Sequence, residues 1–154
     1  MKKIIPILAG LVLAFLVGRE VILGMASEET RIRRLLQDEV DAFNDASVSG
    51  CMAGFAPEYQ DLTSRLDRTS LQRALLYTFQ KHREYRIAAP GELLDVRMRN
   101  DAETEAQVDL RVVLSDGDAP LWAIRVQAEL SRGDHGWRFV SSRYETMEGA
   151  RPGG

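Results

Sequence analysis

The residues best placed to do chemistry lie near the end of the chain, where a predicted strand carries charged side chains among apolar ones. Alternate side chains of a strand point to opposite faces. One face would hold Trp137, Phe139, Ser141, Arg143 and Glu145, and the other Arg138, Val140, Ser142, Tyr144 and Thr146. If the Trp137 face points inward, Arg143 and Glu145 could bind an acid or relay a proton. The alternative is an ordinary ion pair in water.

Other reactive groups are few. His135 lies in a turn flanked by glycines, which predicts a solvated side chain, and His82 ends a predicted helix, which favours a half-buried structural role. Two scattered histidines predict no metal site, because zinc needs three or four converging ligands. No cofactor is expected. The numbers of Ser, His and Asp residues do not exclude a Ser-His-Asp triad, but the sequence lacks the Gly-x-Ser-x-Gly motif that often carries the nucleophilic serine.

Cys51 is the single cysteine of the chain, so no intramolecular disulfide can form. Its neighbours Met52, Ala53 and Phe55 are apolar, which predicts a small buried side chain. The alternative is a bridge to another chain.

Strict alternation of apolar and polar residues predicts the strands that must position these groups. The clearest runs are 106–114 and 122–130, and 94–98 and 85–88 are shorter. Each long run has one apolar and one polar face, which is typical of a sheet covered by helices on one side. Asn100-Asp101, Asp116-Gly117 and the segment 133–136 predict the turns between strands.

Helices are predicted before the sheet. Apolar residues recur every three or four positions over 27–46, with Ser27 as the N-cap. The segment 47–54 allows a short second helix. Thr69 followed by Gln72 forms a capping box that predicts a third helix over 70–83. Residues 58–64 are expected to be a short extended piece or a loop.

The first 26 residues have the pattern of an export or anchoring signal, because Lys2 and Lys3 precede the uncharged run 4–18. Two interpretations remain open: a membrane anchor through residues 4–25, or a signal cleaved after Ala26. Either one places the rest outside the cytoplasm of a bacterium. Residues 27–154 then hold 17 of the 20 basic and 22 of the 23 acidic side chains, a net charge of −5, which disfavours a nucleic-acid partner. Residues 148–154 are expected to form a disordered tail after a domain over 27–147.

The order of these elements resembles the nuclear transport factor 2-like superfamily over residues 29–145. The residues that carry the resemblance are Val40-Asp41-Ala42-Phe43, Phe55-Ala56-Pro57-Glu58-Tyr59 and Gly136-Trp137-Arg138-Phe139-Val140. The resemblance implies an α+β cone in which three N-terminal helices pack on a strongly curved antiparallel sheet. It also implies a pocket at the open end of the cone and frequent dimerisation through the exposed sheet face.

Such folds host enzymes, binding modules and scaffolds, so the fold does not choose among them. The inward faces of 106–114 and 122–130 carry no acid, base or nucleophile. We therefore expect a non-catalytic binding or scaffold domain, with a small apolar or acidic ligand or a second copy of the chain as its partner. The alternative is a small lyase, isomerase or hydrolase. The expected ligand-binding residues are Tyr59, Tyr77, Met98, Trp122, Arg143, Tyr144 and Glu145.

Overall fold

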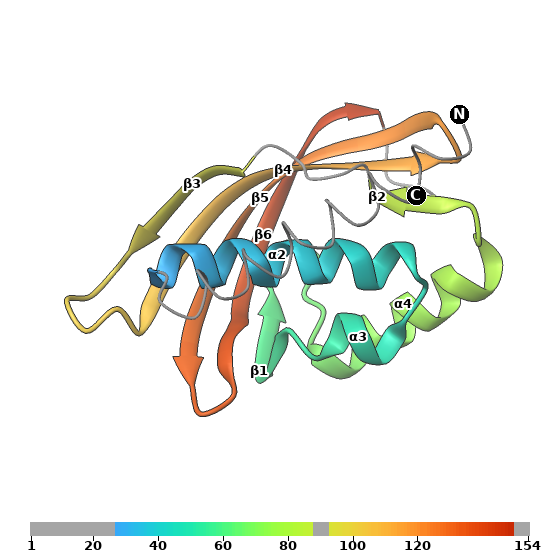
Figure 1. The fold of residues 1–154 in the computed structure, drawn as a ribbon. Coiled ribbons are helices and arrows are strands. Elements are labelled where there is room, and N and C mark those ends of the chain that lie inside the picture. The colour runs from blue at the N-terminus through green and yellow to red at the C-terminus, as the bar shows by residue number, and fades with distance from the viewer. Residues whose placement is uncertain (1–26, 88–92, 150–154) are drawn as a thin grey trace, which may run out of the picture.

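Three helices lie on one face of a curved six-stranded sheet in the computed structural model (Figure 1). The structure describes residues 27–87 and 93–149, so the predicted signal and most of the predicted tail lie outside the described residues. The helices are α2 (Glu28–Asn44), α3 (Val48–Met52) and α4 (Arg68–Lys81). The strands are β1 (Phe55–Asp61), β2 (Tyr85–Ile87), β3 (Leu93–Met98), β4 (Glu105–Asp116), β5 (Ala119–Gly133) and β6 (Gly136–Gly149). The expected α+β cone is confirmed.

The strands follow the order β1-β6-β5-β4-β2, and β3 pairs with the same edge of β4 as β2, over residues 106–110 of β4. The long strands β4, β5 and β6 are antiparallel and joined by tight turns, in which Gly117 and Gly136 adopt positive φ angles of 57° and 87°. One pairing differs from the expected antiparallel sheet, because β1 runs parallel to β6. Strand β1 forms the edge of the sheet, which accommodates Pro57 and its missing N–H.

Helix α2 crosses the concave face of the sheet, which we call the inner face (Figure 1). Ile32 of α2 is fully buried there against strand residues that include Val108 and Leu130. Burying each such aliphatic side chain contributes about 1.5–3 kcal/mol. At the other end of α2, the Asn44 side chain bonds both the backbone N–H and the carbonyl of Ile87, so it fixes β2 to the helix.

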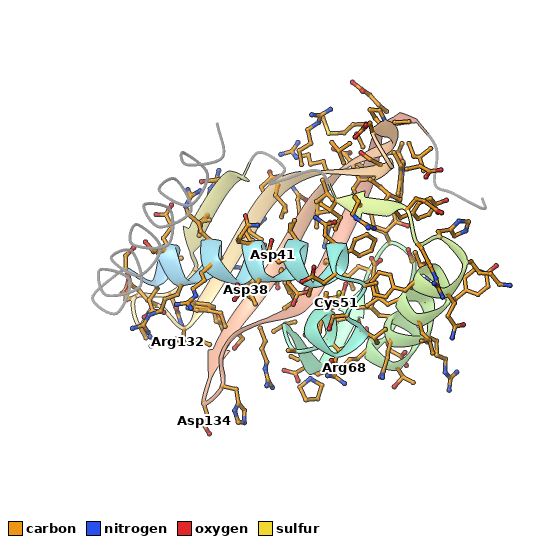
Figure 2. The ribbon with its side chains drawn as sticks, turned by 45° about the vertical axis from the view of Figure 1, so that its right-hand side comes forward. Asp38, Asp41, Cys51, Arg68, Arg132 and Asp134 are labelled. Atoms are coloured by element: carbon orange, nitrogen blue, oxygen red, sulfur yellow. The ribbon has the colours of Figure 1, made fainter. Side chains whose placement is uncertain are left out.

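Glu28, in the first turn of α2, joins that helix to the β5–β6 hairpin. Its carboxylate accepts hydrogen bonds from Trp137 Nε1 at 2.6 Å, Arg132 Nη1 at 2.8 Å and Arg31 Nη1 at 3.1 Å. Figure 2 shows Arg132 beside the beginning of α2 and Asp134 at the tip of the hairpin. These charge-assisted bonds hold the helix against the strands.

Two predicted caps are wrong in detail. Ser27 precedes α2 but makes no capping bond, since its hydroxyl pairs with that of Thr30 at 3.1 Å. Helix α4 begins two residues earlier than predicted, because the Asp67 carboxylate accepts from the Ser70 N–H at 2.8 Å. The Thr69 capping box therefore does not form; an aspartate two residues earlier takes that position.

Candidate functional site

An extra residue in β6 decides which side chains of that strand face inward. Glu129 pairs with Ser141 and Leu130 with Phe139, so Val140 has no partner on β5 and forms a bulge. A one-residue shift turns all following side chains to the other face. Trp137 and Phe139 therefore point inward before the bulge, and Ser142, Tyr144 and Thr146 point inward after it.

The expectation that Arg143 and Glu145 share the Trp137 face is wrong for this reason. Both side chains lie on the convex face, which we call the outer face, where Gln127 pairs with Arg143 and Arg125 with Glu145. Glu145 Oε1 lies 3.9 Å from Arg125 Nη1, an exposed ion pair. Arg125 also binds Asp109, and this hydrogen bond holds the pKa of the Asp109 carboxyl below its usual value.

Neutral polar groups instead line the inner face along β6, and some of them come from β6 while others come from neighbouring segments. We call them the polar row: Tyr59, Ser64, Trp122, Ser142, Tyr144 and Thr146. Tyr59 Oη lies 2.6 Å from Ser142 Oγ, and Tyr144 Oη lies 2.6 Å from Ser64 Oγ. Trp122 Nε1 donates to Thr146 Oγ1 at 3.0 Å. The row thus links β1, the loop after it, β5 and β6 through paired donors and acceptors.

Two of the expected ligand residues meet within this row. The rings of Trp122 and Tyr144 make an edge-to-face contact with centroids 5.6 Å apart. A third expected ligand residue, Tyr59 of β1, bonds Ser142, which lies two residues before Tyr144 on β6. Burial raises the pKa of the Tyr59 hydroxyl to about 12, so it stays protonated and can donate a hydrogen bond at neutral pH.

The apolar residues of the inner face differ in burial from one end to the other. At the closed end, beside the first turns of α2, Ile32, Ala106, Leu130, Trp137 and Phe139 are at most 7% exposed. At the open end, beside β2, the residues are all half-buried: Val112, Leu114, Trp122, Ile124 and Tyr144. The open end therefore offers both apolar surface and hydrogen-bonding groups to a ligand.

The remaining expected ligand residues lie apart from the open end. Tyr77 is 61% exposed on α4. Met98 pairs with Ala106 and packs against the closed end. His82 is half-buried, as predicted, and stacks on Tyr85 with centroids 4.4 Å apart. The ligand roles of Tyr77 and Met98 stay predictions.

Chemistry by charged groups finds little support on this face. Over 106–114, 122–130 and 142–146, strand pairing places no Asp, Glu, Lys, Arg or His on the inner face, and Arg132 lies there only at the closed end, where it is paired with Glu28. Within residues 27–87 and 93–149, no three His, Cys, Asp or Glu side chains come together to hold a metal. No helix in the same ranges is long and apolar enough to cross a membrane.

Glu39 is a buried carboxyl that the sequence pattern did not single out. Burial raises its pKa to about 8, although its carboxylate accepts a hydrogen bond from the Gly54 N–H. A Cβ at Gly54 would lie 2.1 Å from Glu39 Oε1, so any larger residue there would displace the Glu39 carboxylate. Glu39 lies one helical turn from both Leu35 and Phe43, which is the signal that could have identified it as inward-facing.

Cys51 lies close to this carboxyl and is 3% exposed, so the predicted buried thiol is confirmed. Burial and the Glu39 charge raise the pKa of the thiol to about 12. Figure 2 shows Cys51 on α3 near Arg68 at the beginning of α4. Arg68 donates to the carbonyls of Met52 and Phe55, so it fixes the segment that joins α3 to β1.

The fold is that of the nuclear transport factor 2-like, or cystatin-like, domains. No family model matches the chain, and no curated protein matches it significantly. A domain of unknown function with a cystatin-like fold from Nostoc punctiforme matches with a TM-score of 0.65 and 18% identity, over 79% of this chain and 78% of that one. A nuclear transport factor 2-like protein of unknown function from Shewanella oneidensis matches with a TM-score of 0.65 and 14% identity, over 77% and 98%.

A ketosteroid isomerase-like protein from Erwinia carotovora is also similar, with a TM-score of 0.58 and 15% identity over 76% of this chain and 94% of that one. At these identities the likeness shows the fold alone. Since the fold hosts unrelated functions, the function must be argued from the residues of this chain.

Proposed function

We propose that this domain is a non-catalytic binding domain that holds a small, mostly apolar ligand at the open end of its inner face. The observation that carries the proposal is the half-burial of Val112, Leu114, Trp122 and Ile124 beside the polar row. Ligand sites in proteins are mostly apolar surfaces with a few placed polar groups. The neutral hydroxyl groups of the polar row favour a ligand with a hydroxyl or carbonyl group over a charged one.

The alternative, a small lyase, isomerase or hydrolase, has weaker support. It relied on Arg143, Glu145 and a tyrosine acting together, but the bulge at Val140 places both charged residues on the face opposite Tyr59 and Tyr144. The likeness to an isomerase-like protein is one of fold. Over 112–114, 122–124 and 144–146 of the described strands, pairing brings no charged side chain to the inner face, so these residues do not favour proton transfer at the open end.

Location and assembly are part of the same proposal. The pattern of residues 1–26 supports a domain held outside the cytoplasm by an anchor, or released there by cleavage after Ala26. Mass spectrometry of the mature N-terminus distinguishes the two, because cleavage leaves a chain that begins at Ser27. A homodimer through the outer face stays a prediction, and sedimentation of the purified chain tests it.

The test of binding uses the two tryptophans as reporters, Trp122 at the open end and Trp137 at the closed end. The chain is labelled with 5-fluorotryptophan and titrated with 2-naphthol, an apolar ring system with one hydroxyl. We expect the ¹⁹F signal of Trp122 to shift saturably and that of Trp137 to stay in place. Naphthalene, which lacks the hydroxyl, should bind more weakly because the polar groups around it lose a partner.

Trp122→Ala should abolish the binding of 2-naphthol, whereas Leu76→Ala removes an exposed apolar side chain of α4 and should leave binding unchanged. Isothermal titration calorimetry measures both variants. Equal binding by wild type and Trp122→Ala, or a shift of Trp137 in place of Trp122, contradicts the proposal.

A further inference from the structure

The outer face, opposite the face that carries the proposed ligand site, holds a polar hollow. Its volume is about 290 Å³, close to the lower end of the roughly 300–1,000 Å³ range of ligand sites. The residues that line it are Leu62, Gln107, Gln127, Ala128, Glu129, Ser141, Ser142 and Arg143. It lies beside the β6 bulge, where the strands depart from regular pairing.

Strand register explains why these side chains converge. Across β4, β5 and β6, one row of the outer face is Gln107, Glu129 and Ser141. The next row is Asp109, Gln127 and Arg143. Side chains directly opposite on neighbouring strands lie within contact distance, so the two rows form one polar surface.

Leu62 lies beyond β6 and forms an apolar wall of the hollow. Its backbone N–H donates to the Ser142 carbonyl at 2.7 Å, which fixes it beside the strand. Its side chain is nevertheless 49% exposed, which is unusual for a large apolar residue whose backbone is held in place. A ligand with a short apolar part would cover it.

The charges around the hollow leave one cation without a partner. The Glu129 carboxylate binds Arg99, and the Asp109 carboxylate binds Arg125. Arg143, by contrast, makes no side-chain hydrogen bond or ion pair within the described residues. The carboxylates near the hollow are thus neutralised by other arginines, and the guanidinium of Arg143 is left to attract an anion.

We propose that this hollow binds a small carboxylate with a short apolar side chain, held by Arg143 and the neighbouring amide and hydroxyl groups of Gln107 and Ser141. A guanidinium pairs with a carboxylate through two parallel hydrogen bonds, a geometry that lysine does not offer. Leu62 covers the apolar side chain of the ligand. The carboxylate comes from a free small acid or from the C-terminus of a peptide.

The proposal is tested with N-acetyl-L-leucine, which carries both required groups, and with the neutral N-acetyl-L-leucinamide. ¹⁵N-labelled full-length chain is titrated with each, and the amide signals of β5 and β6 around Gln127 and Ser141 are followed. We expect saturable shifts with the acid and at least tenfold weaker binding of the amide. Binding of the amide with equal affinity overturns the proposal, as does the absence of a saturable shift with the acid.

Arg143→Gln should weaken acid binding at least tenfold. The matched control is Arg111→Gln, which removes another guanidinium of the outer face, one that lies 4.0 Å from Glu148 outside the hollow. Unchanged binding by Arg143→Gln, or an equal loss in Arg111→Gln, overturns the proposal. Neither result bears on the inner face, which is tested separately through Trp122.

The source of the carboxylate is settled by comparing N-acetyl-L-leucine with the tripeptide Ala-Ala-Leu. Tighter binding of the tripeptide, lost when its C-terminus is amidated, supports a peptide C-terminus. Equal affinity of the two supports a free small acid. Weaker binding of both by Arg143→Gln is required in either case.

Discussion

The closed and open ends of the inner face are made of similar residues, yet they differ in what covers them. At the closed end, α2 lies directly on the strands, and the Glu28 carboxylate ties the helix to Trp137 and Arg132. At the open end, Leu114 and Ile124 have the same chemistry but stay half-buried. The same alternation of apolar residues thus builds a sealed core at one end and an accessible surface at the other. Hydrophobic periodicity indicates which face is apolar, while the covering helix decides how dry it becomes.

The most direct way to break this comparison is to remove one large side chain from each end. Leu130 is 2% exposed, so Leu130→Ala leaves a cavity and should lower the free energy of unfolding by about 3–4 kcal/mol. Leu114→Ala removes the same atoms from a half-buried position, where water already has access, and should cost about 1 kcal/mol. Urea unfolding measures both. Equal losses would show that the open end is packed as tightly as the closed end.

The pH dependence of stability tests the buried carboxyl between the two ends. Burial raises the pKa of Glu39 to about 8 in the folded chain, whereas in the unfolded chain it stays near its ordinary value of 4.5. Between these values the folded state binds more protons, so its stability falls as the pH rises from about 5 to 8. We expect a loss of about 2–3 kcal/mol over this range, most of it absent in Glu39→Gln. The control Asp41→Asn, an exposed carboxyl of the same helix, should keep the wild-type slope.

The contribution of the closed end's polar anchor is measured by Glu28→Gln. This substitution weakens the bonds to Trp137 and Arg132 and should cost about 1–2 kcal/mol. The matched control is Glu29→Gln, which removes a neighbouring carboxylate whose bond to Arg33 is solvent-exposed, and should cost less than about 0.5 kcal/mol. Thermal unfolding of the two variants suffices. If the two variants lose the same stability, the bonds of Glu28 to Trp137 and Arg132 do not stabilise the closed end more than an exposed ion pair would.

The smallest expected effect is that of the polar row. Tyr59→Phe removes the bond to Ser142 but keeps the buried ring, so it should cost about 1 kcal/mol. Tyr144→Phe, nearer the open end, should cost less, because water can replace its bond to Ser64. Urea unfolding of both variants orders the two positions. A larger loss for Tyr144→Phe would contradict the accessibility of the open end.

The strands and helices were predicted from the sequence because their signals are local. The runs 106–114 and 122–130 alternate without interruption, and they form the centres of β4 and β5. The parallel strand β1 was not predicted as such, since its partner β6 lies about 80 residues away in the sequence. The cap at Asp67 was missed because Thr69 with Gln72 offered a second capping pattern two residues later.

The candidate site was predicted in part. Tyr59, Trp122 and Tyr144 were expected as ligand residues, and the structure brings them to one face of the sheet. Arg143 and Glu145 were assigned to the wrong face because simple alternation does not reveal a bulge. A bulge depends on how β6 pairs with β5, and the residue types of the segment 139–142 do not predict it.

The bulge at Val140 therefore decides which face of the sheet each of residues 141–146 occupies. If Val140 paired regularly with Glu129 in place of bulging out, residues 141–146 would each shift by one position and turn to the opposite face as a block. An arginine and a glutamate would enter the interior, and the hydroxyls of Ser142 and Tyr144 would move to the solvent. Two relatives with nearly identical sequences and the same fold could thus differ in whether their inner face is neutral or charged.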